Sequence, residues 1–230
     1  MALFTDRSDD KVMGGDAATR ALSSIDVENH FVERVYEKIS GVYDFTFGPT
    51  LHPGRLQALD RMAMEPGSTV LEVGVGTGIN LSLYPRSCEI TGIDLSAPML
   101  EKAQERIDKK GLRNCRVMAM DAAAMQFADD TFDIVYAPYL ISVVPDPVAV
   151  AREMRRVCKP GGRIVILNHF KSDNPVISRI ERAISPMCVH LGFKSDLDLP
   201  GFLTQADLTP VSIHKVNLAN MWSLVTCVKD

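Results

Sequence analysis

The stretch VLEVGVGTG, residues 70–78, constrains the fold of this chain more than any other feature. Its first residues are branched and apolar, as in a strand that is buried on both faces of a parallel sheet. Gly74, Gly76 and Gly78 follow, and glycine allows the backbone to turn tightly and to approach a ligand closely. A buried strand that ends in a glycine-rich turn is typical of the first strand and loop of a nucleotide-binding α/β fold.

The glycine spacing and Glu72 narrow the kind of ligand that this loop would bind. A dinucleotide-binding loop has the spacing G-x-G-x-x-G, but here the third glycine comes one residue early and Ile79 holds the expected position. The carboxylate of Glu72 would repel a pyrophosphate, whereas it would attract a ligand with an ammonium or a sulfonium group. S-adenosylmethionine carries both groups. The alternative is a glycine-rich turn without a ligand, because short motifs of this kind have many false positives.

The composition indicates one globular domain and excludes several classes of function. The chain has 230 residues, of which 46% are apolar and 23% charged, as is ordinary for a globular protein. Its net charge of −4 provides no basic field for nucleic acid, and no apolar run approaches the ~18 residues of a membrane span. The five cysteines lie far apart without a CxxC pair, so we expect reduced core thiols and no metal site. They are Cys88, Cys115, Cys158, Cys188 and Cys227.

Strand-like and helix-like stretches alternate after the glycine loop, which predicts a mainly parallel α/β sheet with helices on both faces. Further strands are expected at residues 88–94, 115–121, 132–138 and 163–170, with KPGG at 159–162 as the turn before the last of them. One helix is expected from the N-cap Ser96 to Gly111, and another after the N-cap Asp146. Their apolar faces are formed by Leu100, Ala103 and Ile107 and by Val150, Met154 and Val157.

The C-terminal part of the chain is expected to add an antiparallel hairpin. Residues 211–218 and 222–230 are strand-like and are separated by a short turn only. A parallel pair would need a crossover of a dozen or more residues, for which there is no room. The last two strands should therefore run antiparallel to each other.

Several short motifs in a fixed order give the chain a resemblance to a known family. They are E-V-G-V-G-T-G, Asp94 in I-D-L-S-A-P-M-L, Asp121 in M-D-A, D-D-T-F-D-I-V-Y and K-P-G-G-R. Because these motifs follow one another in the family's order over about residues 66–228, the chain resembles the class I S-adenosylmethionine-dependent methyltransferases. The resemblance implies a Rossmann-like sheet of seven strands, with S-adenosyl-L-methionine as the cofactor.

In sheets of this kind ligands bind beyond the carboxyl ends of the strands, so the resemblance gives the residues there a role. Asp94 would accept hydrogen bonds from two ribose hydroxyls and Asp121 from the adenine amino group, although each acid could also be a cap. Glu72 would face the methionine ammonium, directly or through water, and the Ala122 amide would meet a ring nitrogen. The other expected cofactor contacts are Tyr36, Gly74, Gly76, Gly78, Leu95, Met99 and Ala137. Leu95 and Met99 would pack on the adenine, although a methionine at this spacing is more often a core residue.

The reaction that the resemblance implies needs alignment of the two reactants more than a nucleophilic side chain. In keeping with this, no serine or cysteine lies in a recognisable nucleophile motif. The methyl acceptor is expected where Tyr139 could stack on or hydrogen-bond to an amine and His169 could take its proton. Tyr43 is a third candidate catalytic residue. The alternative for His169 is a polar residue at a strand end.

The segment before the glycine loop narrows the resemblance. Apolar residues on one face of a predicted helix indicate a lid over the cofactor, within residues 21–65. These residues are Phe31, Val32, Val35, Tyr36 and Ile39. The stretch, continued through Tyr43, looks like the N-terminal region of soluble bacterial phosphatidylethanolamine N-methyltransferases. Two alternatives stay open, namely a quinone-precursor C-methyltransferase and a nonenzymatic S-adenosylmethionine-binding module.

Resemblance to the phosphatidylethanolamine N-methyltransferases implies that the substrate amine is methylated stepwise to give phosphatidylcholine. Its product is a quaternary ammonium, and an aromatic ring at Tyr36, Tyr43 or Tyr139 could stabilise that cation by ~0.5–2 kcal/mol. A quinone precursor would instead need a base that forms a phenolate, for which His169 could serve.

The connection at about residues 171–195 is expected to be a helical insertion that meets an anionic membrane. It is far longer than the median connection of ~4–6 residues, and Lys171, Arg179 and Arg182 could attract lipid phosphates. The alternative is a wall of the active site. With residues 1–20 as a flexible leader and 66–230 as the methyltransferase domain, we expect a cytoplasmic protein at the inner face of the membrane.

Overall fold

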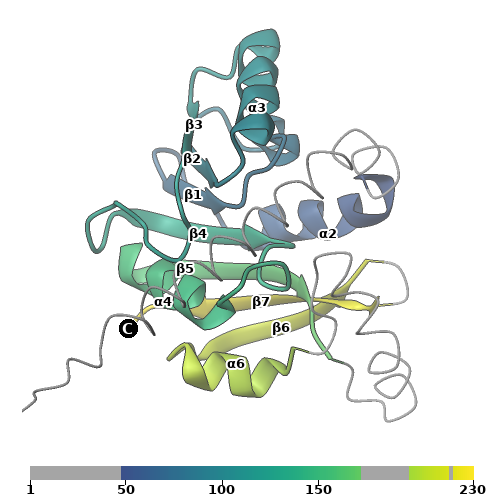
Figure 1. Cartoon of the computed structure of the whole chain (residues 1–230), viewed down its shortest axis with the longest axis vertical. Coiled ribbons are helices and arrows are strands. Elements are labelled where there is room, and N and C mark those ends of the chain that lie inside the picture. The colour runs from purple at the N-terminus through teal and green to yellow at the C-terminus, as the bar shows by residue number, and fades with distance from the viewer. Residues whose placement is uncertain (1–47, 172–196, 218–219) are drawn as a thin grey trace, which may run out of the picture.

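The computed structural model describes residues 48–171, 197–217 and 220–230. They form a seven-stranded sheet in the order β3-β2-β1-β4-β5-β7-β6, strongly twisted across its width (Figure 1). The strands from β3 to β5 are parallel and the hairpin of β6 and β7 is antiparallel, as predicted. Strand β7 also runs antiparallel to β5. The strands are β1 (Thr69–Val73), β2 (Glu89–Asp94), β3 (Cys115–Ala119), β4 (Phe132–Pro138), β5 (Cys158–His169), β6 (Pro210–Val216) and β7 (Trp222–Val228).

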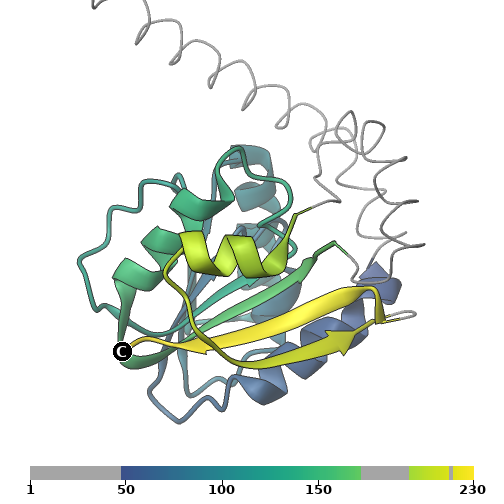
Figure 2. The same ribbon diagram turned by 90° about the horizontal axis from the view of Figure 1, so that it is seen from below.

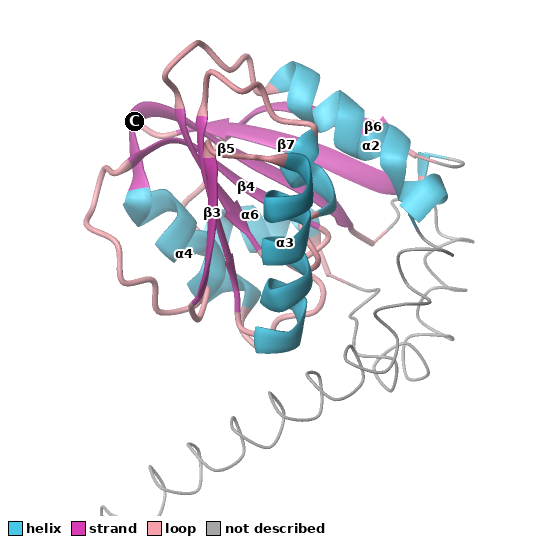
Figure 3. Ribbon diagram, turned by 90° about the horizontal axis from the view of Figure 1, so that it is seen from above, coloured by secondary structure: helices cyan, strands magenta, loops and turns pink. Residues whose placement is uncertain are grey.

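Helices cover both faces of the sheet. The helices are α2 (Gly48–Arg61), the 3-10 turn η1 (Ile79–Ser82), α3 (Ala97–Lys110), α4 (Pro147–Val157) and α6 (Leu199–Gln205). Residues of α2, η1 and α3 pack into one apolar cluster, and residues of α4 and α6 pack into another on the opposite face. Figure 2 shows α2 and α6 on opposite sides of the strands β6 and β7, and Figure 3 shows α3 and α4 likewise separated by the sheet.

Adjacent residues of the central strands face opposite layers. In β5, Val165 and Leu167 belong to the cluster under α2, whereas Ile164 and Ile166 belong to the cluster under α4. Both faces are covered, so both sets of side chains must be apolar. This is why the central strands read as continuous apolar runs in the sequence.

The two predicted helices are confirmed, with one difference in detail. Helix α3 ends at Gly111, which adopts the left-handed conformation at φ 56°, and α4 begins after Asp146, which accepts a hydrogen bond from the Ala149 amide at 2.9 Å. Ser96 occupies the position before α3, but its side chain makes no capping hydrogen bond. The predicted apolar residues of both helices are buried.

The start of β5 differs from the prediction. Phe132 pairs with Cys158 and Ile134 with Arg163, so residues 159–162 form a bulge within the strand rather than a turn before it. Gly161 lies at the bulge with φ 74°, and its amide donates to the Lys229 carbonyl. The pairing with β4 therefore begins at Cys158, five residues before the predicted start. Helix α6 was not predicted.

Helix α2 belongs to the segment that the sequence predicts as a lid. Its residues Ala58 and Leu59 are buried, as is Met62 just after it, and all three pack with Val165 and Leu224 of the sheet. Among the helices that the structure describes, none is both long and apolar enough to cross a bilayer. The predicted leader and most of the predicted insertion at 171–195 lie outside the described residues, and the domain boundaries remain predictions.

Candidate functional site

The predicted site residues follow strands whose carboxyl ends meet at one edge of the sheet. Gly74 follows β1, Asp94 ends β2, Asp121 lies two residues beyond β3, and Tyr139 follows β4. His169 ends β5. The strand order reverses between β1 and β4, which places the switch point, where open α/β sheets bind ligands, beside Gly74 and Tyr139.

The glycine loop combines close packing with an open side. Gly78 has φ 73°, and a Cβ there would lie 2.7 Å from Leu81 and 3.1 Å from Ala103, so the residue lets the loop pack on α3. Gly76 has φ 53°, and a Cβ there would meet nothing within 4 Å. Positive φ favours glycine at both positions, and the open space at Gly76 lets a ligand approach the backbone.

The Asp94 side chain joins the glycine loop after β1 to the residues just before α3. Its carboxylate accepts hydrogen bonds from the Gly76 amide at 2.8 Å and from the Ser96 amide at 3.0 Å. Burial raises the pKa of this carboxyl, and the bonds from the backbone amides partly oppose that rise. The acid thus holds the glycine loop against the start of α3. The ribose contact expected of it remains a proposal.

Glu72 is buried, and each of its carboxylate oxygens accepts one hydrogen bond from a neighbouring side chain. Asn80 donates to its Oε1 at 2.7 Å, and the Tyr84 hydroxyl donates to its Oε2 at 2.6 Å. Burial raises the pKa of this carboxyl to about 7, although the bonds from Tyr84 and Asn80 and the nearby charge of Arg55 lower it. Each carboxylate oxygen retains a second lone pair, so a ligand ammonium remains a possible further partner.

Arg55 of α2 is a site residue that the sequence analysis missed. It is buried, its Nη1 donates to Asn80 Oδ1 at 3.0 Å, and its guanidinium lies 4.9 Å from the centre of the Tyr139 ring. Its Nε is buried and has no hydrogen-bond partner among the described residues. The sequence feature that could have identified Arg55 is its positive charge on an otherwise apolar stripe along one face of a helix. This stripe consists of Leu51, Arg55, Ala58, Leu59 and Met62.

The residues predicted to hold the adenine are placed around the ends of β2 and β3. Asp121 is exposed and accepts a hydrogen bond from the Ala123 amide at 2.8 Å, so it does cap the following turn. Leu95 is 45% exposed, while Met99 and Ala122 are half-buried. Ala137 is completely buried in the core cluster under α4, so its side chain is enclosed by protein.

Tyr139 is held in an uncommon conformation by several contacts. Its φ of 59° is rare for a residue with a Cβ, and its amide donates to the Leu167 carbonyl at 2.6 Å. Its hydroxyl donates to the Leu51 carbonyl at 2.8 Å and accepts from Asn217 Nδ2 at 2.9 Å. The hydroxyl therefore has structural partners on α2 and beyond β6, whereas the ring packs under Arg55.

His169 presents one ring nitrogen to the backbone. Its Nδ1 lies 2.8 Å from the carbonyl oxygen of Met221, and its ring packs against Trp222 with ring centres 6.2 Å apart. A carbonyl oxygen only accepts, so Nδ1 carries the hydrogen, and Nε2 of the neutral ring bears the lone pair. This tautomer can accept a proton at Nε2.

Some predicted residues lie outside the described part of the chain, namely Tyr36, Tyr43, Arg179 and Arg182. Lys171 is described, half-buried, and donates its amide to the Leu197 carbonyl at 3.0 Å. The four described cysteines are free and buried, and no His, Cys, Asp and Glu cluster in the described ranges could hold a metal ion.

Comparisons with known proteins show the family of this chain. Residues 71–166 match a family described as a methyltransferase domain. The chain is 42% identical over 166 residues to a phosphatidylethanolamine N-methyltransferase of Cereibacter sphaeroides, covering 72% of this chain and 81% of that protein. It is 34% identical over 145 residues to a demethylmenaquinone methyltransferase of Anoxybacillus flavithermus, covering 59% of this chain and 61% of that protein.

The fold is shared with solved methyltransferase structures. One of them is phosphoethanolamine N-methyltransferase 2 of Haemonchus contortus in complex with S-adenosyl-L-methionine, with a TM-score of 0.71 and 19% identity. The match covers 88% of this chain and 60% of that one. The chain belongs to the class I S-adenosylmethionine-dependent methyltransferases. The first of the two relatives above is named for a phosphatidylethanolamine substrate, and the second for a demethylmenaquinone substrate.

The described residues fit S-adenosylmethionine on three structural observations. The open space at Gly76 admits a ligand against the loop backbone, and the Glu72 carboxyl accepts a hydrogen bond from Asn80 of η1, which begins directly after the loop. The orphaned Nε of Arg55 supplies a donor that a carboxylate could satisfy. The site thus contains an acid for an ammonium and a guanidinium for a carboxylate, as the amino acid part of the cofactor requires.

Proposed function

We propose that this protein transfers methyl groups to the amine of phosphatidylethanolamine and of its mono- and dimethylated forms, giving phosphatidylcholine. The observation that carries the proposal is the 42% identity to a phosphatidylethanolamine N-methyltransferase over 81% of that relative's length. The demethylmenaquinone methyltransferase is less similar, at 34% identity over 61% of its length.

In this proposal the edge beyond β1, β2 and β3 binds the cofactor. Asp94 accepts hydrogen bonds from the ribose hydroxyls, Asp121 accepts from the adenine amino group, and the Ala122 amide donates to the ring. Leu95 and Met99 contact the adenine, and Tyr36 closes the site from the N-terminal segment. The bound cofactor supplies an electrophilic methyl group on a sulfonium.

Glu72 and Arg55 together orient the amino acid part of the cofactor. The ammonium lies toward Glu72, and the carboxylate pairs with the Arg55 guanidinium. Asn80 holds both side chains, since it donates to Glu72 and accepts from Arg55. The side-chain amide of Asn80 therefore sets the distance between the Arg55 guanidinium and the Glu72 carboxylate.

The acceptor amine is placed between the ends of β4 and β5. Only a neutral amine has the lone pair that attacks the methyl group, so an ammonium substrate must first lose a proton. His169 Nε2 is the proposed acceptor of that proton, because Nδ1 is held by the Met221 carbonyl. The rings of Tyr139 and Tyr43 stabilise the cationic product by about 0.5–2 kcal/mol.

The phospholipid reaches the site from a membrane surface in this proposal. The chain carries a net charge of −4, so attraction to an anionic bilayer must come from a local basic group. Lys171, at the end of the described segment, together with Arg179 and Arg182 forms that group. The protein then acts in the cytoplasm, associated peripherally with the inner face of the membrane.

A second candidate is C-methylation of a quinone precursor, in which His169 could take the same role as proton acceptor. A ring carbon attacks efficiently only when its phenol is ionised, and the Nε2 lone pair of His169 could take the phenolic proton. The quinone-modifying relative supports the same reading.

The test uses the full chain with methyl-labelled S-adenosylmethionine and separate substrate arms. One arm holds vesicles with phosphatidylethanolamine, one holds demethylmenaquinone in detergent, and one holds neither. The proposal expects label in mono-, di- and trimethylated phospholipid. Label in the quinone alone would establish the second candidate, and cofactor binding without any transfer would indicate a nonenzymatic binding module.

A further inference from the structure

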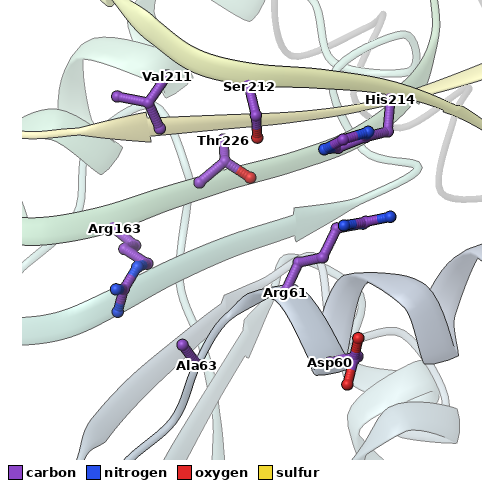
Figure 4. A pocket seen from close by; sticks show the side chains of 8 residues that line it. All are labelled: Asp60, Arg61, Ala63, Arg163, Val211, Ser212, His214 and Thr226. Carbon is purple, nitrogen blue, oxygen red and sulfur yellow. The ribbon is translucent and has the colours of Figure 1, made fainter.

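An open pocket of about 430 Å³ lies between α2 and the strands β5, β7 and β6. Its walls come from the end of α2, from the beginning of β5 and from the hairpin (Figure 4). The volume falls within the range of about 300–1,000 Å³ that is common for small-molecule sites. Arg163 lines the pocket and lies six residues before His169 in β5. The pocket is therefore about 20 Å from His169, at the carboxyl end of that strand.

The pocket exists because α2 is shorter than the sheet face that it covers. Val165 of β5 and Leu224 of β7 pack under α2. Arg163 follows on the same face as Val165, and Thr226 on the same face as Leu224, because side chains two apart in a strand share a face. The helix ends at Arg61, so it does not extend over Arg163, which is half-buried, whereas Thr226 is buried beside it.

Positive charge and hydroxyl groups converge on this pocket. Arg61 and Arg163 face Ser212 and His214 across it, and Asp60 is the single acid in its lining. Arg163 Nη1 donates to the Met62 carbonyl at 3.3 Å, which uses one of its five N–H groups. Within the described ranges, the side chains of Arg61, Ser212 and His214 form no hydrogen bond or ion pair.

Thr226 gives an independent indication of a ligand. Its residue is 6% exposed, and its Oγ1 is buried with no hydrogen-bond partner among the described residues. Figure 4 shows this hydroxyl turned toward the pocket, and Ser212, which also lines the pocket, is the register partner of Thr226 on β6. A buried hydroxyl without a partner is destabilising, and an oxygen of a ligand in the pocket would accept its hydrogen.

We propose that this pocket binds a small phosphate ester. The phosphate oxygens accept hydrogen bonds from the two guanidiniums and from the hydroxyls of Ser212 and Thr226, and the planar guanidinium suits paired phosphate oxygens. Val211 and Ala63 supply apolar contact for the organic part. The ester comes either from a soluble metabolite or from the headgroup of a phospholipid, since both present the same chemistry.

The experiment titrates the full chain with glycerol 3-phosphate and follows the methyl resonances of Thr226 and Val211. The proposal expects both resonances to shift in a saturable way. Arg61→Gln should weaken binding by at least about threefold, and Arg61→Gln with Arg163→Gln by at least about tenfold, because charge-assisted bonds are lost. Arg113→Gln, at an exposed arginine outside the pocket lining, is the matched control and should leave the affinity unchanged.

The single Arg61→Gln variant controls for misfolding, because the Arg61 side chain forms no hydrogen bond or ion pair within the described residues. Thr226→Val keeps the shape and removes the hydroxyl, and it should weaken binding by about threefold. A second arm uses short-chain phosphatidic acid as monomers. Tighter binding of this lipid at the same resonances assigns the site to a headgroup, and tighter binding of glycerol 3-phosphate assigns it to a soluble ester. Absence of any shift, or equal affinity in the wild type and the double variant, would overturn the proposal.

Discussion

The hydroxyl of Tyr84 donates a hydrogen bond of 2.6 Å to Glu72 Oε2 at a point where both residues are buried. Asn80 holds the other carboxylate oxygen, and Arg55 holds Asn80. Four polar side chains thus form a network behind the glycine loop. Burial raises the pKa of the acid in this network, Glu72, to about 7.

The first prediction concerns the pH dependence of stability. The raised pKa means that the folded state holds the Glu72 proton more tightly than the unfolded state, whose value is 4.5. The stability that this proton contributes is fully present below pH 4.5 and is lost as the pH rises through 7. The full effect is about 3 kcal/mol. Urea unfolding of Glu72→Gln across this range should show a flatter profile than the wild type, and parallel profiles would contradict the assignment.

Binding of the cofactor should also release a proton from Glu72. If the ligand ammonium lies beside this carboxyl, the added positive charge lowers its pKa, so the acid ionises on binding. Calorimetry in two buffers of different ionisation enthalpy measures the proton release directly. We expect a net release near pH 6 to 7 that disappears in Glu72→Gln. Equal release by both proteins would show that the ammonium is bound elsewhere.

The second residue to test is Asp94. Asp94→Ala removes the proposed acceptor of two ribose hydrogen bonds of about 1.5–3 kcal/mol each, and it releases the Gly76 amide. The dissociation constant for S-adenosylmethionine should rise at least about tenfold. Asp108→Ala, at an acid exposed on α3, serves as the control. A folded Asp94→Ala with unchanged affinity would remove the residue from the cofactor site.

Tyr139→Phe separates the hydroxyl of this residue from its ring. The change leaves the Leu51 carbonyl and Asn217 Nδ2 without a partner, so the free energy of unfolding should fall by about 1–2 kcal/mol. The ring stays under Arg55, so cofactor affinity should change little. Asn217→Ala combined with Tyr139→Phe should be less than additive, since both act on one bond. A large loss of turnover without a loss of stability would instead assign the hydroxyl to the substrate.

Arg156 is expected to be the main support of the loop between β3 and β4. Its guanidinium donates to the carbonyls of Met125 and Phe127 and to the carboxylates of Asp129 and Glu153. Lysine cannot reproduce this fork, so Arg156→Lys should lower the free energy of unfolding by about 2 kcal/mol. Arg152→Lys on the same helix α4 should cost less, because Arg152 bonds to one exposed carbonyl. Equal losses in both variants would contradict this role.

The proposed membrane contact predicts a dependence on lipid charge and salt. Arg179→Glu with Arg182→Glu should reduce flotation with anionic vesicles, because each basic residue near the surface contributes about 1 kcal/mol. Arg113→Glu with Arg152→Glu changes the net charge equally at another place. Equal flotation of the two double variants, or equal binding to neutral vesicles, would exclude a local basic contact.

The parts of the fold that follow from local patterns were predictable. Apolar runs located β1, β2 and β4 to within one residue, because strands covered on both faces are mostly apolar. The hairpin of β6 and β7 followed from the lack of room for a crossover. The bulge at Gly161 was missed because the turn motif and the strand overlap, and the pairing of Gly161 with Lys229 decides between them.

The candidate site was only partly predictable, because its contacts join residues that are distant in the sequence. Motif spacing identified Glu72 and Asp94, but their hydrogen-bond partners depend on tertiary packing. Tyr84 reaches Glu72 across η1, and Arg55 reaches the site from a helix that precedes β1. A charge on the apolar stripe of α2 was the one local signal. For Asp121 the sequence allowed two roles, a cap of the following turn and a contact with the ligand. The structure shows the cap, a hydrogen bond from the Ala123 amide.

The position of β7 between β5 and β6 governs the order in which the sheet can be completed. During synthesis β5 and β6 emerge first, yet neither can pair with the other, since β7 must lie between them. Until residues 222–228 have left the ribosome, the backbone N–H and C=O groups on one edge of β5 stay unpaired, and such an edge is a template for aggregation. Folding of this half of the sheet is therefore expected to wait until β7 is available for pairing. A substitution that weakens β7 should reduce the yield of soluble protein more than an equal weakening of α4.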